Sequence, residues 1–471
     1  MDYDLLILGG GSAGYNGAST ASGLGLRVGL VEAGPDLGGL CILRGCMPSK
    51  TLLESAHRYD TLRRAGEFGL SAGEIGFCRE TIRERKERLV AEFADYRARQ
   101  LQSGRFDFHR ARAAFVDPHT VELTAPDGSR SRLTARTFLL ATGSDHQKID
   151  LPGLDECGAL NSDDVLDFRG ELPASLIILG GGATAVEFAW FYAVMGVEVT
   201  LIQRGRQLLK SVDRDVAECV EASFRKRGIR VYTHTELLKI ETGKNGKRVT
   251  FRQVDQTITV EAEAIFAALG REPNTGGLAL EKAGVAMMRG HLQVLPTQQT
   301  SVPHIFAAGD VAGPYEIVHI AIQQAEVAVR NAARWVKAGR DDRTPDADRL
   351  EEIDYRVRLS VVFGHPEVAV AGLTERELSI ASIPYRVASY LFADHGKAMV
   401  AGEEEGFVKL LVSEESGEIV GAAVVGAHAS ELIHEVAVAM RFRATAADLA
   451  AIPHYHPTLS EIWTYPAEEL A

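Results

Sequence analysis

DYDLLILGGGSAGYNGASTASGLGLRVGLVEAG, residues 2–34, decides the fold class. The apolar run LLIL is typical of a buried strand, and the loop after it supplies Gly9, Gly11 and Gly14 at G-x-G-x-x-G spacing. The first glycine permits a tight turn, the second lets the backbone approach a pyrophosphate, and the third lets a helix pack closely on the strand. A second apolar run ends at Glu32, whose carboxylate can accept hydrogen bonds from ribose hydroxyls. The stretch therefore predicts a strand–helix–strand unit that binds a dinucleotide.

The same plan occurs a second time in SLIILGGGATAVEFAWFYAVMGVEVTLIQRG, residues 175–205. The positions of its glycine motif are occupied by Gly180, Gly182 and Ala185. Two such units predict two bound dinucleotides. A flavoprotein that exchanges hydride with a nicotinamide needs both FAD and NAD(P), whereas a plain dehydrogenase needs one dinucleotide.

The second copy lacks the terminal acid of the first. Gln203 stands in its place, and basic residues follow at Arg204, Arg206 and Lys210. A carboxylate would repel the 2′-phosphate of NADP, whereas nearby arginine and lysine side chains would bind it. This favours NADP over NAD. The alternative is that the three basic residues form an ordinary solvated cluster on an exposed loop.

Two cysteines, Cys41 and Cys46, lie in GGLCILRGCMPSK at residues 38–50, just after the first unit. A zinc site would need two further ligands at close spacing, but the other three cysteines are scattered singly, so no metal site is expected. Pro48 and the glycines suit the start of a helix, whose N-terminus would stabilise a thiolate. We therefore predict a redox-active dithiol–disulfide pair, with a core or metal role as the alternative.

Size and charge narrow the class of protein further. A chain of 471 residues is expected to form several domains, and a net charge of −13 argues against a nucleic-acid binder. Residues 5–26 carry no charge, but their Gly, Ser, Thr and Asn content indicates a strand and glycine loop rather than a membrane span or signal peptide. The expected compartment is the cytoplasm, where a close cysteine pair is more often catalytic or metal-binding than structural.

With these motifs in place, the chain resembles the pyridine nucleotide-disulfide oxidoreductase family over nearly its whole length. Family members carry a GGTCxNxGCxPSK-like segment, and Leu43 replaces the usual Asn here. The resemblance implies an α/β fold with two Rossmann-like domains, for FAD and NAD(P), and a C-terminal α+β dimerisation domain. It also implies that Cys46 faces the flavin, that Cys41 attacks substrate, and that Lys50 lies near the flavin, paired with Glu187.

Three further segments match the family in order: FLLATGS (138–144), AALGREPN (267–274) and TSVPHIFAAGD (300–310). By this resemblance Asp310 binds the ribityl chain of the flavin, although an Asp in this position is otherwise typical of a turn. Further cofactor contacts that the resemblance implies are Gly39, Lys50, Ala113, Thr142 and Gly143 for FAD, and Glu187 and Gly270 for NAD(P).

IPHYHPTLSEIW, residues 452–463, places a histidine and a glutamate five residues apart. Thr458 or Ser460 could start a helix that carries Glu461, and this carboxylate could fix the tautomer of His456 and raise its basicity. Such a pair is as often structural as catalytic. HPTLSE matches the family's HPTxSE motif, however, which implies that His456 is a base oriented by Glu461 and acts on the cysteines of a second subunit. The active form would then be a homodimer. His454 is a rival that the motif disfavours.

The motifs divide the chain into an FAD domain at residues 1–145 and 273–345, an NAD(P) domain at 146–272, and a dimerisation domain at 346–471. A charged, turn-rich linker is expected at 338–352. Residues 407–426 alternate like a β-hairpin, and 429–442 have helical spacing.

The function expected from all of this is electron transfer between NAD(P)(H), FAD, the cysteine pair and a small lipoamide-like dithiol or disulfide. It is most like that of the dihydrolipoamide dehydrogenase branch of the family. One alternative is an NADPH-dependent reductase of another small disulfide, a metal ion or a quinone. Mercury is disfavoured because the chain ends in AEELA, without a cysteine pair. A different class would be a flavoprotein binding subunit without disulfide turnover, which the intact cysteines, His456 and Glu461 oppose.

Overall fold

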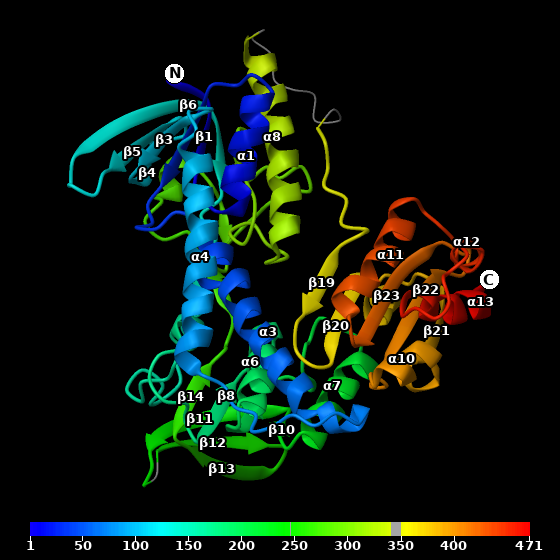
Figure 1. The fold of residues 1–471 in the computed structure, drawn as a ribbon. Coiled ribbons are helices and arrows are strands. Elements are labelled where there is room, and N and C mark those ends of the chain that lie inside the picture. The colour runs from blue at the N-terminus through cyan, green and yellow to red at the C-terminus, as the bar shows by residue number, and fades with distance from the viewer. Residues whose placement is uncertain (245, 341–349) are drawn as a thin grey trace. The chain divides into compact units, whose positions relative to one another are not determined.

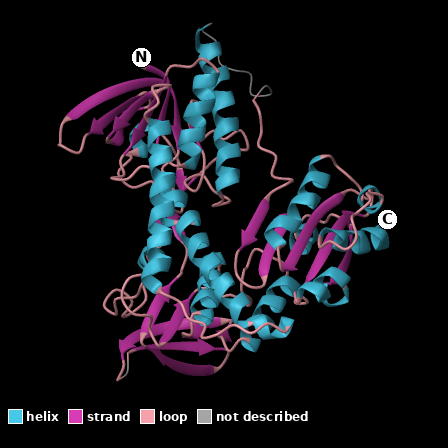
Figure 2. Cartoon of the chain, in the orientation of Figure 1, coloured by secondary structure: helices cyan, strands magenta, loops and turns pink. Residues whose placement is uncertain are grey.

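The computed structural model describes residues 1–244, 246–340 and 350–471, which group into two compact units (Figures 1 and 2). The first unit comprises Met1–Ser49, Glu84–Gln147 and Arg271–Asp354, and the second comprises Lys50–Arg83, Lys148–Gly270 and Tyr355–Ala471. The three domain boundaries expected from the sequence stay a prediction. Part of the expected linker at 338–352 lies outside the described residues.

The first unit is built on a seven-stranded sheet in the order β3-β2-β1-β6-β5-β4, with β18 paired to β6. β1, β2, β3, β6 and β18 pair in parallel, and β4, β5 and β6 form an antiparallel meander. The strands are β1 (Tyr3–Leu8), β2 (Val28–Glu32), β3 (Asp107–Arg110), β4 (Arg112–Asp117), β5 (Thr120–Thr124), β6 (Arg130–Leu140) and β18 (Ile305–Ala307). The smaller ladders join β7 (Ser144–His146) to β15 (Arg271–Pro273) and β16 (Met287–Met288) to β17 (His291–Leu292).

Alternate residues of β1 enter two different cores, as a strand covered on both faces requires. Leu5 and Ile7 pack in the core of α1 (Ser12–Gly23) and α8 (Val318–Arg340), which lie side by side in Figure 1. Leu6 and Leu8 enter a second core with the meander. The predicted strand–helix–strand unit is thus β1, α1 and β2. The other helices of this unit are α2 (Gly39–Arg44) and η2 (Leu280–Ala283), while α3 (Cys46–Arg63) and α4 (Arg79–Leu101) continue into the second unit.

The second unit repeats this plan with a parallel sheet in the order β10-β9-β8-β14. Leu176 and Ile178 of β8 pack with α6, whereas Ile177 and Leu179 face the antiparallel sheet β11-β12-β13. The second predicted dinucleotide unit is therefore β8, α6 and β9. The elements are α5 (Ser162–Asp167), β8 (Ser175–Leu179), α6 (Ala183–Val194), β9 (Glu198–Ile202), α7 (Arg214–Lys226), β10 (Arg230–Tyr232), β11 (Thr235–Thr242), β12 (Lys247–Gln253), β13 (Gln256–Ala262), β14 (Ala264–Ala267) and the short helix η1 (Ala65–Phe68).

The C-terminal part of the second unit is an antiparallel sheet in the order β19-β20-β23-β22-β21, with α11 packed on β20 and β23 (Figure 2). The predicted hairpin and the predicted helix at 429–442 are confirmed as β22, β23 and α11. The hairpin is more buried than an alternating pattern implies, because all five central residues of β22 are inaccessible. The elements are β19 (Leu359–Val362), β20 (Glu367–Gly372), α9 (Glu375–Ile380), β21 (Tyr385–Leu391), η4 (Phe392–Asp394), α10 (Gly396–Ala401), β22 (Phe407–Ser413), β23 (Ile419–Gly426), α11 (Ala429–Arg441), α12 (Ala446–Ala450), η5 (Ser460–Trp463) and α13 (Thr464–Leu470).

Residues 5–26, the longest uncharged run, fold as β1, the glycine loop and α1. Among the described residues, no helix has the length and apolar character that crossing a membrane requires.

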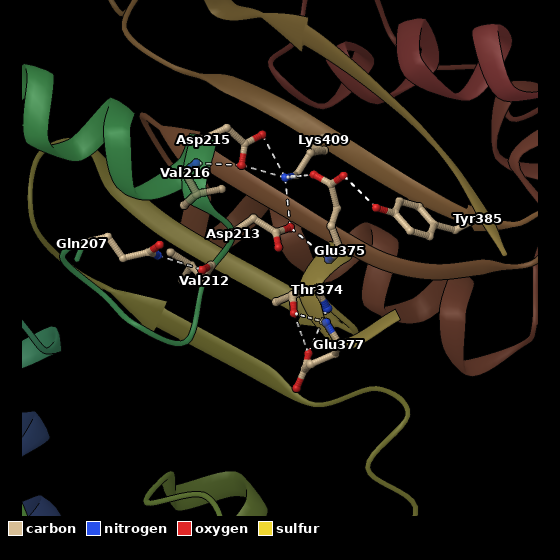
Figure 3. A network of polar contacts seen from close by, with 10 residues as sticks. All are labelled: Gln207, Val212, Asp213, Asp215, Val216, Thr374, Glu375, Glu377, Tyr385 and Lys409. Atoms are coloured by element: carbon tan, nitrogen blue, oxygen red, sulfur yellow. Dashed lines mark hydrogen bonds and ion pairs between the residues drawn. The ribbon is translucent and has the colours of Figure 1, made fainter. Parts of the chain in front are cut away.

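A buried lysine ties the start of α7 to the C-terminal sheet within the second unit (Figure 3). The side chain of Lys409 on β22 is 1% exposed, and its Nζ lies 2.9 Å from Asp213, 2.7 Å from Asp215 and 2.9 Å from Glu375. Three carboxylate oxygens this close together would suit a divalent cation, but the ammonium group contacts all three. Asp213 is the N-cap residue of α7, so its charge also faces the positive end of that helix.

We expect Lys409→Met to lower the free energy of unfolding by about 3–5 kcal/mol, because it leaves the buried carboxylate of Asp213 and the partly exposed carboxylates of Asp215 and Glu375 without a counter-ion. The measurement is thermal and urea unfolding of the FAD-loaded protein. Arg214→Met on α7 is the matched control, since its ion pair with Glu218 is exposed, and it should change nothing measurable. Equal stability of Lys409→Met and the control would contradict the expectation.

The pH dependence of this contact has a definite sign. Burial alone would lower the pKa of Lys409, but hydrogen bonds and charge from the three carboxylates outweigh burial and raise it above its usual value. The folded state therefore binds this proton more tightly than the unfolded state does. The stabilisation is complete below the unfolded-state pKa and is lost only as pH rises through the higher folded-state pKa.

Candidate active site

The first glycine loop has the geometry that a dinucleotide requires. Gly9 has a φ of +109°, and a Cβ built on it would lie 2.2 Å from the carbonyl oxygen of Ala141. A Cβ on Gly14 would lie 1.8 Å from the carbonyl oxygen of Gly9. At Gly11 the nearest atom to such a Cβ is Gly39 Cα, 3.9 Å away, so no side chain fills the space beside the loop. Glycine is thus required for packing at two positions, and the third leaves room for a phosphate at the start of α1.

Glu32 at the end of β2 holds this loop together. One carboxylate oxygen accepts a hydrogen bond from the amide of Gly10 at 2.7 Å, and the other accepts one from Gly34 at 2.6 Å. Each oxygen keeps a further lone pair that a ribose hydroxyl could use. The residues fit the adenosine end of a dinucleotide such as FAD.

Asp310, expected to bind the flavin side chain, is held by two residues to which the motifs alone assign no role. The Ser144 hydroxyl donates to Asp310 Oδ2 at 2.6 Å, and Arg271 Nε donates to that hydroxyl at 2.8 Å. Arg271 also donates to the main-chain carbonyl of Ser144 at 2.7 Å. Both residues belong to segments that match the family, and the pairing of β7 with β15 joins those segments. The sequence motifs therefore contain Ser144 and Arg271, but they do not show that these two residues contact each other beside Asp310.

The remaining candidates for FAD in the first unit occupy loops and strand ends. The Thr142 hydroxyl donates to the carbonyl of Asn274 at 2.6 Å, so it fixes the loop after β6. Gly143 has a φ of +73° with no atom within 4 Å of a built Cβ. Ala113 is half-buried on β4 and offers only backbone and methyl contacts. Their roles as cofactor contacts stay a prediction.

The second glycine loop repeats the geometry of the first. A Cβ on Gly180 would lie 2.2 Å from the carbonyl oxygen of Ala268, and Gly182 has no atom within 4 Å of a built Cβ. Ala185, at the third position, is fully buried in α6. Gly270, after β14, has a φ of +109°.

Gln203 takes the place that Glu32 occupies in the first copy. Its side chain lies 2.9 Å from a Cβ built on Gly181, and its Nε2 donates to the carbonyl of Gln207 at 3.3 Å. It therefore brings no negative charge to the loop. The basic side chains that follow are exposed, and within residues 1–244, 246–340 and 350–471 none of them forms an ion pair; they are Arg204, Arg206 and Lys210.

The cysteine pair lies on two consecutive helices that are joined by a single residue, Gly45. Cys41 is on α2 and Cys46 is the first residue of α3, and both are half-buried. At Gly45, between them, a Cβ would lie 3.2 Å from Cys41 Cα, so the chain folds back over that residue. Gly39, with a φ of +69°, would place a Cβ 2.6 Å from Gly11 Cα. The backbone of α2 is thus packed directly against the first glycine loop, and glycine at both positions makes this approach possible.

The other cysteines lack these surroundings. Burial raises the pKa of Cys219 to about 11, so this thiol stays protonated at neutral pH. The Cys157 thiol donates to the carbonyl of Leu154, and Cys78 is exposed beside Glu80. Cys219 lies inside α7 and Cys157 lies in a turn, whereas Cys78 directly precedes α4 but has the carboxylate of Glu80 beside its sulfur, which disfavours a thiolate.

The predicted ion pair between Lys50 and Glu187 is present within the second unit. Lys50 Nζ lies 3.0 and 2.9 Å from the two oxygens of Glu187, which is 3% exposed on α6. The amide of Phe363 donates to the same carboxylate at 2.9 Å, and the lysine ammonium lies over the Phe363 ring. That this pair lies beside a flavin stays a prediction.

The predicted pair of His456 and Glu461, called the dyad below, is also present. His456 Nδ1 lies 3.2 and 3.1 Å from the oxygens of Glu461, so Nε2 points away from the carboxylate, and the imidazole side chain is 79% exposed. Glu461 is buried on the 3₁₀ helix η5, which begins at Ser460 without a side-chain cap. The rival His454 has both ring nitrogens engaged, by the carbonyl of Ile452 and the carboxylate of Glu435. Only His456 therefore combines a held ring with an accessible nitrogen.

Beside Ser144 and Arg271, sequence reasoning missed a residue that contacts Glu461. His395, at the start of α10, is completely buried, and its Nε2 lies 3.3 Å from Glu461 Oε1. Nothing in the local sequence around it signals this contact, because the two residues are brought together only by the packing of the C-terminal sheet.

Comparison with known proteins agrees with this geometry. Residues 3–325 match the model of the pyridine nucleotide-disulphide oxidoreductase family, and residues 359–467 match the dimerisation domain of the same family. The chain is 32% identical to the dihydrolipoyl dehydrogenase of Geobacillus stearothermophilus, covering 99% of this chain and 96% of that protein. It is 33% identical to the dihydrolipoyl dehydrogenase of Chlamydia muridarum, with the same coverage.

Two solved structures are similar over the full length. LpdA from Mycobacterium tuberculosis has a TM-score of 0.86 and 28% identity, covering 99% of both chains. The Cu(II) complex of the HOCl-induced flavoprotein disulfide reductase RclA from Escherichia coli has a TM-score of 0.82 and 25% identity, covering 100% of both. The glycine loops, the cysteine pair and the dimerisation domain are thus those of an FAD- and pyridine-nucleotide-dependent disulfide oxidoreductase, and the chain belongs to the pyridine nucleotide-disulphide oxidoreductase family.

Proposed function

We propose that this enzyme catalyses the reversible reaction of a lipoamide-like dithiol with NADP⁺ to give the cyclic disulfide, NADPH and a proton. The substrate class is supported by the dihydrolipoyl dehydrogenases among its relatives and by the HPTLSE motif. The observation that carries the proposal is the His456–Glu461 dyad in a chain that also holds the Cys41 and Cys46 pair, since a dithiol substrate needs both a sulfur acceptor and a base.

The chemistry proceeds by thiol–disulfide exchange. His456 Nε2 takes a proton from a substrate thiol, and the resulting thiolate attacks Cys41 of the oxidised pair, so that the Cys41–Cys46 bond breaks and Cys46 leaves as a thiolate. The second substrate thiol then loses its proton to solvent, and its sulfur attacks the substrate sulfur of the mixed disulfide. The bond to Cys41 breaks, the cyclic substrate disulfide is released, and Cys41 leaves as a thiolate that takes the proton from the imidazolium of His456. The first glycine loop, Glu32 and Asp310 would hold FAD, which would supply the two-electron transfer between the reduced pair and the nicotinamide. The positive end of α3 would favour the Cys46 thiolate.

His456 would act on the cysteines of the partner subunit in a homodimer. The match of residues 359–467 to a dimerisation domain supports a dimer, and the exposed imidazole suits a group that serves a second chain. The buried Glu461 would stabilise the imidazolium that forms when the proton is taken.

NADP would be preferred because the second loop carries no acid and has three exposed, unpaired basic residues. A steady-state panel tests substrate and cofactor together: dihydrolipoamide with NADP⁺ or NAD⁺, and NADPH with glutathione disulfide. We expect the highest kcat/KM for dihydrolipoamide with NADP⁺. Combined replacement of Arg204, Arg206 and Lys210 by Ala should lower kcat/KM for NADP⁺ by roughly 10–100-fold, because charge-assisted hydrogen bonds to the 2′-phosphate are lost, and leave NAD⁺ nearly unchanged.

Arg214→Ala, an exposed basic residue on the next helix, is the matched control and should behave as the parent enzyme. If NAD⁺ outperforms NADP⁺ in the parent enzyme, the cofactor assignment is wrong. If glutathione disulfide outperforms the lipoamide pair, the substrate assignment is wrong.

A metal-ion reductase is the second candidate function. The RclA structure, which is similar to this chain over its full length, is a Cu(II) complex. The same panel distinguishes it through an arm with NADPH and Cu(II), in which Cu(I) is trapped by a chelator. Cu(II) reduction faster than lipoamide turnover, and unaffected by His456→Ala, would favour this second function.

A further inference from the structure

Two histidines contact the carboxylate of Glu461 from opposite environments. His456 is 79% exposed and faces both oxygens through Nδ1. His395 is 0% exposed, and its Nε2 lies 3.3 Å from Oε1. The acid of the dyad is therefore shared between a solvent-facing imidazole and a buried one.

The buried imidazole is held at an energetic cost. Within residues 1–244, 246–340 and 350–471, neither ring nitrogen of His395 has a well-aligned hydrogen-bond partner, although Nε2 is close to Glu461. A buried unsatisfied polar group destabilises a fold, whereas phenylalanine would pack there without that cost. The rings of His395 and Tyr465 pack edge to face, with their centroids 6.1 Å apart. An apolar ring at position 395 could make the same contact. Packing therefore does not account for a histidine at this position, whereas the nearby carboxylate does.

The charge state follows from the surroundings. Burial, the largest effect, lowers the pKa of His395; Glu461 opposes this, and His456 acts in the same direction as burial. His395 is therefore neutral at pH 7, and the negative charge of Glu461 remains for His456 to use. The charged residues next to His395 in the sequence are Asp394 and Lys397.

We propose that His395 is a positioning residue for the His456–Glu461 dyad. From the buried side it stabilises the negative charge of the Glu461 carboxylate, and it thereby sets how strongly His456 binds a proton. This inference rests on the proposed function. A neutral N–H dipole close to one oxygen stabilises the carboxylate and weakens its pull on the imidazolium of His456.

The test compares His395→Phe, which keeps the ring and its contact with Tyr465, with His395→Gln, which keeps a donor. In dithiol oxidation, where activity rises with pH as the base loses its proton, His395→Phe should move the rising limb of kcat/KM upward by about 0.5–1 pH unit. It should also lower kcat roughly 10-fold. His395→Gln should restore most of both. Tyr465→Phe is the matched control and should leave the profile in place.

A double-variant cycle shows whether His395 acts through the dyad. In a His456→Ala background, adding His395→Phe should cause no further loss, whereas a purely structural role would cost the same in both backgrounds. Anaerobic reduction of the bound flavin by NADPH should be unchanged in every variant, since that half of the reaction uses neither histidine.

An unshifted profile in both His395 variants, with turnover by the parent enzyme that depends on His456, would overturn the inference and leave the proposed function standing. Turnover by the parent enzyme that is independent of His456 would instead remove the proposed function itself. Should His395→Phe not fold, His395→Leu, which also lacks a donor, takes its place in the comparison with His395→Gln.

Discussion

Cys41→Ser and Cys46→Ser should each abolish dithiol–disulfide turnover while leaving FAD bound and reducible by NADPH. Thiol–disulfide exchange needs both sulfurs, one to form the mixed disulfide and one to leave as thiolate, and a serine hydroxyl can do neither at neutral pH. NADPH oxidation by an artificial electron acceptor, which bypasses the pair, should survive in both variants. Turnover and this bypass activity are measured side by side on the same preparations.

The two variants should differ in colour, which assigns the roles of the two sulfurs. Cys41→Ser leaves Cys46 as a lone thiol at the start of α3, and its thiolate next to an oxidised flavin should give a permanent long-wavelength absorption band. Cys46→Ser should show no such band, even on NADPH titration. Cys78→Ser, at an exposed cysteine outside the pair, is the control and should match the parent enzyme. A band that persists in Cys46→Ser, or turnover that survives in either variant, would rule out the disulfide mechanism.

The parts of this site that the sequence could predict are those encoded locally. Gly9 and Gly14 meet backbone carbonyls at distances that no side chain tolerates, so their spacing reports the turn directly. Glu32 is the last residue of β2 and Gln203 directly follows β9, the equivalent strand of the second unit, so aligning the two repeats is enough to reveal their difference. His456 and Glu461 are five residues apart, within reach along one short segment.

The parts that could not be predicted depend on contacts between distant segments. Lys409 and Asp215 are 194 residues apart in the chain, and an isolated lysine within a strand pattern gives no sign of three carboxylates around it. Ser144 and Arg271 lie in motifs that the sequence reveals, but their relay to Asp310 required the pairing of β7 with β15. The contact of His395 with Glu461 likewise depends on tertiary packing. Local patterns define elements and motifs, whereas tertiary packing decides which buried polar groups meet.

His456→Ala should lower dithiol–disulfide turnover by roughly 10²–10⁴-fold, because the variant loses the group that takes the proton from the substrate thiol. FAD binding and the long-wavelength band on NADPH titration should persist, since neither depends on this side chain. The pH profile of kcat/KM for dithiol oxidation should also lose the limb that reports this base and follow the substrate thiol instead. Stopped-flow measurement of each half-reaction separates these effects from a general loss of structure.

Control variants at two other histidines and at Glu461 test the assignment to His456. His434→Ala removes an exposed imidazole from α11 and should leave turnover unchanged. Glu461→Gln keeps a hydrogen-bond acceptor for His456 Nδ1 but removes the charge that stabilises the imidazolium, so it should be slower than the parent enzyme and faster than His456→Ala. His454→Ala should chiefly reduce stability, because both of its ring nitrogens are engaged by Ile452 and Glu435. If His454→Ala loses more turnover than His456→Ala, the base is the other histidine, and the exposed Nε2 of His456 would have no part in the proton transfer.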